Sequence, residues 1–512
     1  MNHTPKPPRG KVYLVGAGPG APGLITQRGR QCLGQADLVL HDGLVSPELL
    51  EYAPPSAEVV PVCRHGKSGP RPRASADQVA AVLAEAARDG RIAVYLKSGD
   101  PHVFGRAGRE LEALRAAGVS YETVPGVTAA SAVAACAEIP LTHAAHASAV
   151  ALLTGHQPRE AHTPPLDYAA LARFPGTLVF YMGSESAAEW SRALIEAGRP
   201  AETPVAVVRR CSWPEQRTYL GTLESLAELI RRHRIEPPTL IVVGPAAAFA
   251  PERPWFVRPP LFGIRVLVTR PREQAGPVAR HLAELGADVL RQPAIRIEPP
   301  ADWSRVDAAL GRLHTYDCLV FSSVNGVRYL LNRLRQTGGD MRRLGTVRLA
   351  AIGPATAEEL RRYHLQADLV PPEYRAEALA DRLAGGAAGR RFLLARAGRG
   401  REVLAERLRE AGGVVDQVVV YHSTDVAEPD PRVAAELAAG RIDWITVTSS
   451  AIARALVAMF GEGLRRARLA SISPVTSGIL RELGYPPAVE AREYTTDGLL
   501  AAIRSVPAAW SS

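Results

Sequence analysis

Short β-branched runs alternate with alanine- and leucine-rich helical patterns over almost the whole chain, and this alternation most constrains the fold. Examples are RIAVYLKSGD followed by GRELEALRAAG, and later RRFLLARAG followed by REVLAERLREAGG. Strands that are separated by helices usually pair in parallel, because a parallel connection needs a long crossover. The pattern predicts an α/β protein with parallel sheets and with functional loops at the carboxyl ends of strands.

The chain of 512 residues is too long for one ordinary core, so several domains are expected. KVYLVGAG at residues 11–18 and IRVLVTRP at 264–271 begin alike, each as a strand followed by a turn and a helical pattern. Between them, residues 244–263 are rich in proline, which resists both helix and strand. We expect a loose tail at 1–10 and domains at 11–258 and 259–512, with the boundary near Pro259.

The second half repeats itself weakly. CLVFSSVNGVRYLL at 318–331 resembles WITVTSSAIARALV at 444–457, and residues 349–366 resemble residues 469–486. The repeat predicts two related lobes, and a cleft between such lobes is a natural ligand site.

Composition excludes several classes of protein. With 46% hydrophobic and 22% charged residues, the chain has the profile of a soluble globular protein. No stretch resembles a signal peptide, and no run of about 18 apolar residues suggests a membrane span. The cysteines lack CxxC spacing, which argues against disulfides and a zinc ribbon and favours the cytoplasm; they are Cys32, Cys63, Cys136, Cys211 and Cys318.

The net charge of +9 comes mostly from arginine and leaves three interpretations open. A nucleic-acid partner is one, although no lysine-rich tail or aromatic-basic interleaving accompanies the charge. A polyanionic small molecule is another, since guanidinium groups match carboxylates. The third is a solvated arginine-rich surface.

The loop GAGPGA at 16–21 fits the dinucleotide fingerprint G-x-G-x-x-A, and Asp42 closes the next apolar run. Pro19 and Pro22, however, each remove a backbone N–H that a pyrophosphate would need. The loop therefore suits an uncharged or cationic ligand, or it is a plain tight turn. His143 and His146 invite a zinc interpretation, but no third ligand follows at a usual spacing, so we expect no metal.

Several strand-end motifs of the first half resemble those of the tetrapyrrole methyltransferases, and within them the uroporphyrinogen-III C-methyltransferases. The motifs, spread over residues 12–255, are GAGPGAPGLIT, HDGLVS, YLKSGDPHVFGRAGRE, TVPGVTAA, EIPLTH, TGH and YMG. The resemblance implies S-adenosylmethionine as co-substrate and a homodimer formed through this half. The cofactor contacts it implies are Pro19, Ser98, Gly99, Asp100, Val103, Thr128, Ala129, Met182 and Cys211.

The resemblance also implies a catalytic acid–base pair. Asp42 matches the base, and the position of the second group carries Arg64, which clamps a carboxylate more readily than it transfers a proton. Lys67 could substitute for it. The chain departs from the family at Ala21, Ser98, Glu138, Ala144 and Cys211. Candidates for binding the carboxylate-rich substrate are Arg28, Arg106, Arg109 and Arg217.

Residues 261–506 resemble the uroporphyrinogen-III synthases through the order of VLVTRP, FSSVNGV, AAIGPATAEEL, VVVYHS, VTSSAIARAL and SISPVTSGILRELG. The resemblance implies closure of hydroxymethylbilane, with Tyr421 assisting the departure of hydroxide. It implies substrate contacts from Thr269, Ser323, Asn325, Thr356, Ser449 and Thr476, although such hydroxyls also cap helices.

Together the two resemblances imply a cytoplasmic bifunctional enzyme that forms uroporphyrinogen III and methylates it twice, stopping at precorrin-2. Its partners would be small tetrapyrroles, with no nucleic acid and no membrane. Two alternatives remain open: an NAD-dependent α/β oxidoreductase, and a tetrapyrrole-sensing protein without catalysis.

Overall fold

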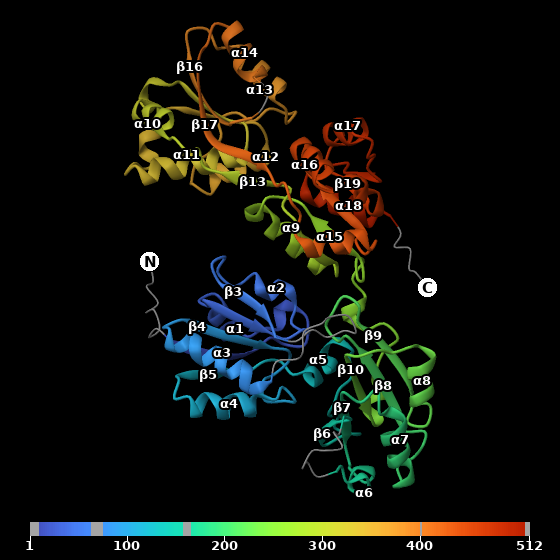
Figure 1. Cartoon of the computed structure of the whole chain (residues 1–512). Helices are drawn as coiled ribbons and strands as arrows, with labels where there is room; N and C mark the ends of the chain where they lie inside the picture. Colours follow the sequence, from blue (N-terminus) through green and yellow to red (C-terminus); the bar gives the residue numbers. More distant parts are fainter. Residues whose placement is uncertain (1–9, 63–74, 157–164, 400–401, 507–512) are drawn as a thin grey trace. The chain divides into compact units, whose positions relative to one another are not determined.

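The chain divides into two compact units, 1–263 and 264–512. The structure, a computed structural model, describes residues 10–62, 75–156, 165–399 and 402–506 (Figure 1). Among the described residues, no helix has both the length and the apolar character needed to cross a membrane.

Unit 1 begins with a sheet of five parallel strands in the order β3-β2-β4-β1-β5. The strands are β1 (Lys11–Gly16), β2 (Leu38–His41), β3 (Glu58–Pro61), β4 (Ile92–Lys97) and β5 (Tyr121–Val124). The helices that follow these strands are α1 (Gln27–Leu33), α2 (Pro47–Leu50), α3 (Ala76–Arg88), α4 (Ala107–Ala116) and α5 (Ala129–Cys136). Because all five strands run in parallel, their carboxyl ends share one edge, where the loops after β1, β2, β4 and β5 lie together.

The second sheet of unit 1 has the order β6-β7-β10-β8-β9, and only β6 and β7 pair in parallel. Its strands are β6 (Val150–Thr154), β7 (Thr177–Tyr181), β8 (Pro204–Arg209), β9 (Arg217–Thr222) and β10 (Thr239–Val243), with helices α6 (Tyr168–Ala172), α7 (Ala187–Glu196) and α8 (Leu226–Arg232). The expectation of parallel sheets is wrong here. A short turn, rather than a crossover helix, joins β8 to β9, and such a turn forces antiparallel pairing.

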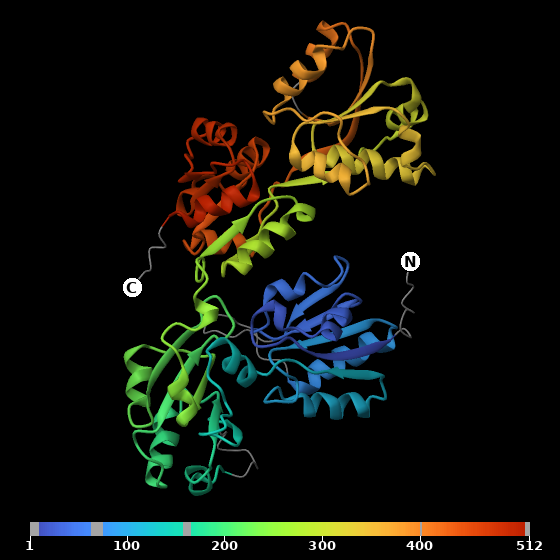
Figure 2. The ribbon, with the colours of Figure 1, turned by 180° about the vertical axis from the view of Figure 1, so that it is seen from behind.

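Unit 2 contains two further sheets, one in each of two lobes. The order β12-β11-β18-β19-β20 is parallel throughout, whereas β13-β17-β16-β14-β15 has β13 antiparallel to β17. Figure 2 shows one lobe in yellow and orange and the other in green and red. The repeated segments at 318–331 and 444–457 fall one in each lobe, so the predicted two-lobed architecture is confirmed.

The elements of unit 2 follow the alternation that the sequence predicts. Its strands are β11 (Arg265–Val268), β12 (Asp288–Arg291), β13 (Ile295–Glu298), β14 (Cys318–Phe321), β15 (Arg348–Ala351), β16 (Arg391–Ala397), β17 (Val414–Asp425), β18 (Trp444–Val447), β19 (Arg468–Ser471) and β20 (Val489–Glu490). Its helices are α9 (Arg272–Glu284), α10 (Ser304–Gly311), α11 (Val324–Gln336), α12 (Pro354–Arg361), α13 (Ala376–Ala384), α14 (Val403–Glu410), α15 (Pro431–Ala438), α16 (Ser450–Phe460), α17 (Pro474–Glu482) and α18 (Thr496–Arg504).

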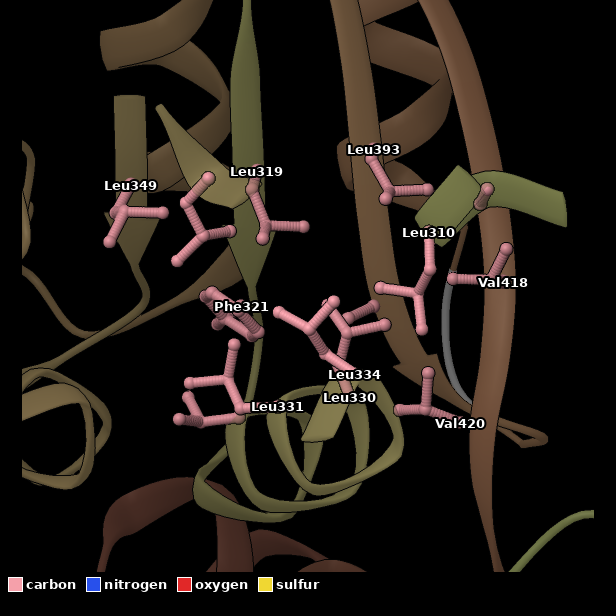
Figure 3. Packing of buried hydrophobic residues seen from close by; sticks show 14 of the residues in the cluster. Leu310, Leu319, Phe321, Leu330, Leu331, Leu334, Leu349, Leu393, Val418 and Val420 are labelled. Atoms are coloured by element: carbon pink, nitrogen blue, oxygen red, sulfur yellow. The ribbon is translucent and has the colours of Figure 1, made fainter. Parts of the chain in front are cut away.

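Helix α11 illustrates how a core forms from helical spacing. Its buried residues at three- and four-residue intervals face β14, where Leu319 and Phe321 are also fully buried (Figure 3). The helix residues of this stripe are Val327, Leu330, Leu331 and Leu334. Ser323 begins the helix by accepting a hydrogen bond from the N–H of Gly326, as Ser449 does for α16 from Ile452.

Candidate active sites

Four glycines bring the strand ends of the first sheet of unit 1 into backbone contact. The N–H of Gly99 donates to the carbonyl of Gly18 at 2.8 Å, and the N–H of Gly18 donates back to Gly99. A Cβ atom on Gly126 would lie 2.1 Å from the carbonyl oxygen of Gly99 and 2.7 Å from Cα of Gly16. Only glycine permits this approach, so these positions are fixed by sterics.

The loop after β1 uses its N–H groups within the protein. Ala17 donates to Lys97 at 2.7 Å, and Ala21 donates to the hydroxyl of Ser212 at 3.1 Å. Gly18 is bonded to Gly99, and Pro19 and Pro22 have no N–H. A loop in this state has few amide donors for a pyrophosphate.

The same loop is held by the second half of unit 1. The indole N–H of Trp213 donates to the carbonyl of Pro19 at 2.9 Å. A Cβ atom on Gly20 would lie 2.4 Å from the Trp213 ring. The loop is therefore fixed from two sides before any ligand binds.

Apolar side chains lie near the start of α5. The hydroxyls of Thr128 and Tyr181 are 2.7 Å apart, and the N–H of Ala130 donates to Tyr181. The ring of Phe104 lies 4.7 Å from that of Tyr181, centroid to centroid. Phe104 and Met182 both have positive φ angles, and Met182 is 46% exposed, an unusual state for an apolar side chain.

Two carboxylates hold these loops together. One oxygen of Asp42 accepts from the N–H and the hydroxyl of Ser98 at 2.7 and 2.8 Å, and the other accepts from the N–H of Leu44 at 2.9 Å. Asp100 accepts from the N–H groups of His102 and Gly126. Each acid therefore has two structural roles: it links its own loop to a loop that follows another strand, and it accepts a hydrogen bond within its own turn.

Two predicted cofactor contacts, Cys211 and Val103, belong to the same hydrophobic cluster as Tyr181. The Cys211 thiol is buried in the core beside Cys136, and its burial and the hydrogen bond between the two thiols raise its pKa well above the usual value. The Cys211 side chain thus lies in the core, which leaves only its backbone for the predicted ligand contact. Val103 packs on the edge of the same core. His143 and His146 stack on one another with ring centroids 4.9 Å apart.

The arginines predicted for substrate binding differ in availability. Arg28 forms an ion pair with Glu122 at 2.8 Å, so its guanidinium already has a carboxylate partner. Within the described part of the chain, Arg106 forms no ion pair and is exposed. Arg109 and Arg217 are also exposed. Arg64 and Lys67 lie outside the described residues.

In unit 2 a cleft of about 310 Å³ lies between the two lobes, as the repeat predicts. It is lined by residues of both lobes, among them Asn325, Tyr421 and Ser449. The Tyr421 hydroxyl lies 3.1 Å from that of Ser323. Burial raises the pKa of Tyr421, which keeps its hydroxyl protonated at neutral pH.

Three predicted substrate contacts have almost fully buried side chains and are not among the residues that line the cleft: Thr269, Thr356 and Thr476. The Thr269 hydroxyl donates to the carbonyl of Thr446, and Thr476 lies beside Ser473, which caps α17. The side chains of these residues therefore serve the fold, and the predicted contact is left to their backbone groups.

Sequence reasoning missed other polar residues that line the cleft: Arg270, Gln274, Arg399, Ser423 and Thr448. Arg270 and Thr448 are each adjacent to a predicted residue. Neighbouring side chains in an extended chain point to opposite sides, so a buried Thr269 directs Arg270 away from the core and toward the cleft. This alternation is the sequence feature from which Arg270 could have been predicted.

Comparison with known proteins covers both units. A family model described as Tetrapyrrole (Corrin/Porphyrin) Methylases matches residues 11–227, and one described as Uroporphyrinogen-III synthase HemD matches residues 277–501. The chain is 32% identical over 450 residues to the Porphyrin biosynthesis protein HemD of Ruminiclostridium josui, covering 88% of each protein. It is 37% identical to the Uroporphyrinogen-III C-methyltransferase of Bacillus subtilis, covering 71% of the chain and 74% of the relative. With the Siroheme synthase of Nitrosomonas europaea it shares 42% identity, covering 50% of the chain and 53% of that protein.

Proposed function

Because the chain belongs to the tetrapyrrole methylase family in its first half and to the uroporphyrinogen-III synthase family in its second, we propose a bifunctional tetrapyrrole enzyme. It closes hydroxymethylbilane to uroporphyrinogen III and transfers two methyl groups from S-adenosylmethionine to give precorrin-2. The observation that carries the proposal is the match of two family models to successive parts of one chain. We assign methylation to residues 11–258 and ring closure to residues 259–512; residues 1–9 of the expected tail lie outside the described residues.

The residues at the strand ends of unit 1 fit a methyl donor without phosphates. Two prolines and three N–H groups already bonded within the protein leave the 16–22 loop poor in donors, as a sulfonium ligand requires. S-adenosylmethionine would supply an electrophilic methyl group, whose transfer removes the positive charge of the sulfonium. The residues proposed to hold it are Pro19, Ser98, Gly99, Asp100, Val103, Thr128, Ala129 and Met182.

Asp42 is the proposed base of the methylation. Its carboxylate is oriented by three donors from two loops, which fixes the direction of the remaining lone pairs. Arg64 and Arg106 are proposed to bind carboxylates of the macrocycle through their guanidinium groups.

Tyr421 is the proposed acid of ring closure. A phenol is protonated at neutral pH and can donate its proton to a departing hydroxide, which then leaves as water. Ser323, whose hydroxyl lies 3.1 Å away, orients the phenol. Asn325 and Ser449 line the same cleft and are proposed to bind acidic arms of the substrate.

The proposed product of the second half, uroporphyrinogen III, is the proposed substrate of the first half. Fusion of the two halves would be useful because the free macrocycle is easily oxidised. Connected sites raise the local concentration of the shared intermediate. We further propose that the protein works in the cytoplasm, as a homodimer formed through the methylase half. The described cysteines are all free thiols, in keeping with a reducing compartment.

Anaerobic incubation of the full chain with hydroxymethylbilane and S-adenosylmethionine tests the proposal, with products followed by absorbance and mass. The expected product is the type III macrocycle carrying two added methyl groups. Unmethylated type III product would contradict the assignment of the first half. Type I macrocycle, which forms without enzyme control, would contradict the assignment of the second.

A further inference from the structure

Arg270 carries a guanidinium in the cleft of unit 2 without a carboxylate partner. The residue follows β11 and precedes α9, and it lines the cleft together with Gln274, Thr448 and Ser449. Its Nε donates a long hydrogen bond to the Thr448 hydroxyl at 3.3 Å. Within the described ranges, no aspartate or glutamate forms an ion pair with it.

Other arginines of unit 2 that pack between elements are neutralised by carboxylates. Arg328 forms a two-pronged pair with Glu359 at 2.6 and 2.9 Å, and Arg333 forms one with Asp307 at 2.7 and 2.6 Å. Arg399, on the opposite wall of the same cleft, reaches Asp425 at 2.7 Å. Arg270 differs from these arginines, since burial without a compensating charge lowers its pKa below the usual value for arginine.

The walls around Arg270 favour a strong interaction with an anion. Ile295, Ile297 and Ile452 line the cleft and lower the local dielectric, which strengthens an ion pair formed there. A guanidinium with unused donors matches a carboxylate through two parallel hydrogen bonds. A partly buried cation without a partner costs stability, and a bound carboxylate would relieve that cost.

We propose that Arg270 binds one carboxylate arm of the linear bilane and so positions the chain for closure. The proposal rests on the proposed ring-closing function and adds a substrate-binding residue to it. One terminal nitrogen of Arg399 already donates to Asp425 and Ser423, so Arg399 is expected to contribute less. The ligand class is a side-chain carboxylate of a polyacidic tetrapyrrole.

Kinetics of ring closure by the full chain give the first test. Arg270→Gln is expected to raise KM for hydroxymethylbilane about tenfold to a hundredfold, since a charge-assisted pair is lost. Arg270→Lys, which keeps the charge without the fork, is expected to fall between this variant and the wild type. Arg399→Gln is expected to raise KM less than threefold. Arg342→Gln removes an equal charge at an exposed position and serves as the control. An unchanged KM in Arg270→Gln with intact wild-type activity would overturn the role of Arg270 and leave the proposed function standing.

Chemical labelling provides a second test that does not depend on turnover. Phenylglyoxal modifies accessible guanidinium groups, and peptide mass spectrometry reports the modification of Arg270 in the full chain. The octacarboxylate uroporphyrin is expected to protect Arg270 at least fivefold, whereas its octa-amide and inorganic phosphate are not. Protection by phosphate to the same degree would indicate a general anion site and overturn the proposal. If the wild type does not close the bilane, the proposed function fails. The labelling result is independent of turnover: if uroporphyrin does not protect Arg270, Arg270 does not bind a carboxylate.

Discussion

Asp42 shows how one residue in the methylase unit combines structure with proposed chemistry. Its carboxylate accepts two hydrogen bonds from Ser98 and one from Leu44. The hydroxyl bond depends on the Ser98 side chain. The amide bond does not, because it uses the backbone.

Replacing Asp42 with asparagine tests this position. The substitution removes the negative charge and one acceptor, so methylation is expected to slow about a hundredfold while ring closure stays intact. Both activities are measured on the same preparation. Ser98→Gly, which removes only the hydroxyl donor, is expected to change methylation less than tenfold. Equal loss of both activities in Asp42→Asn would contradict the assignment and indicate general unfolding.

Glu122 gives a prediction about pH. Hydrogen bonds from Arg28 and Lys11 hold the pKa of this carboxyl at about 2, below its usual 4.5. Because the folded pKa is depressed, the pair stabilises the fold above pH 4.5, and this contribution is lost as pH falls toward 2. Glu122→Gln is expected to lower the free energy of unfolding by ~1 kcal/mol at pH 7, since the pair is partly exposed. Urea unfolding at a series of pH values measures this free energy, with Glu112→Gln, at an exposed position, as the control. If the difference in free energy between Glu122→Gln and the wild type is as large at pH 2 as at pH 7, the prediction is contradicted.

Among the secondary-structure elements, the crossing of three strand ends at Gly16, Gly99 and Gly126 is the most constrained. Gly126→Ala places a Cβ atom against backbone atoms that cannot move without shifting β1 or β4. We expect a loss of ~1–3 kcal/mol in the stability of unit 1 and a loss of methylation, with ring closure retained. Gly108→Ala, on α4 where a Cβ meets nothing within 4 Å, is the matched control and is expected to be neutral or stabilising. Thermal unfolding and both assays distinguish the two, and wild-type behaviour of Gly126→Ala would contradict the steric argument.

The same elements show how far the sequence carries the fold. Alternation of strands and helices correctly predicts the first sheet and the two lobes of unit 2, because hydrophobic periodicity is local. The alternation does not predict the second sheet of unit 1. There RTYLGT, at residues 217–222, forms β9, and β9 pairs with β8 in the antiparallel direction. Periodicity alone does not report a strand with exposed and half-buried residues only.

Site residues show a similar division. Asn325, Tyr421 and Ser449 line one cleft, and the Ser323 hydroxyl lies 3.1 Å from that of Tyr421. Motif order identifies Asn325 and Ser449 because they follow corresponding strands of the two lobes, β14 and β18. It could not tell that the Thr356 and Thr476 hydroxyls turn inward, since that depends on how each first helical turn packs. Nor could it show that Arg270 lacks a counterion, which only the three-dimensional neighbourhood reveals.

At the scale of the whole molecule, the hydrophobic clusters of the described residues each draw on one unit only. The buried clusters around α5 and α7 belong to residues before 263, and those around α11 and α16 belong to residues after it. Separate cores allow separate cooperative unfolding.

Ligand binding should therefore stabilise one unit without the other. S-adenosylhomocysteine, the product left by methyl transfer, is expected to raise the midpoint of one thermal transition of the full chain and leave the second unchanged. At a concentration one hundred times its dissociation constant, the stabilisation is about 2.7 kcal/mol. Calorimetry measures both transitions, and proteolysis with mass spectrometry identifies which unit each belongs to. If only the midpoint of the transition of residues after 263 rises, the placement of the methyl-donor site is contradicted. If both midpoints rise together, independent unfolding is contradicted, because binding to one unit would then also stabilise the other.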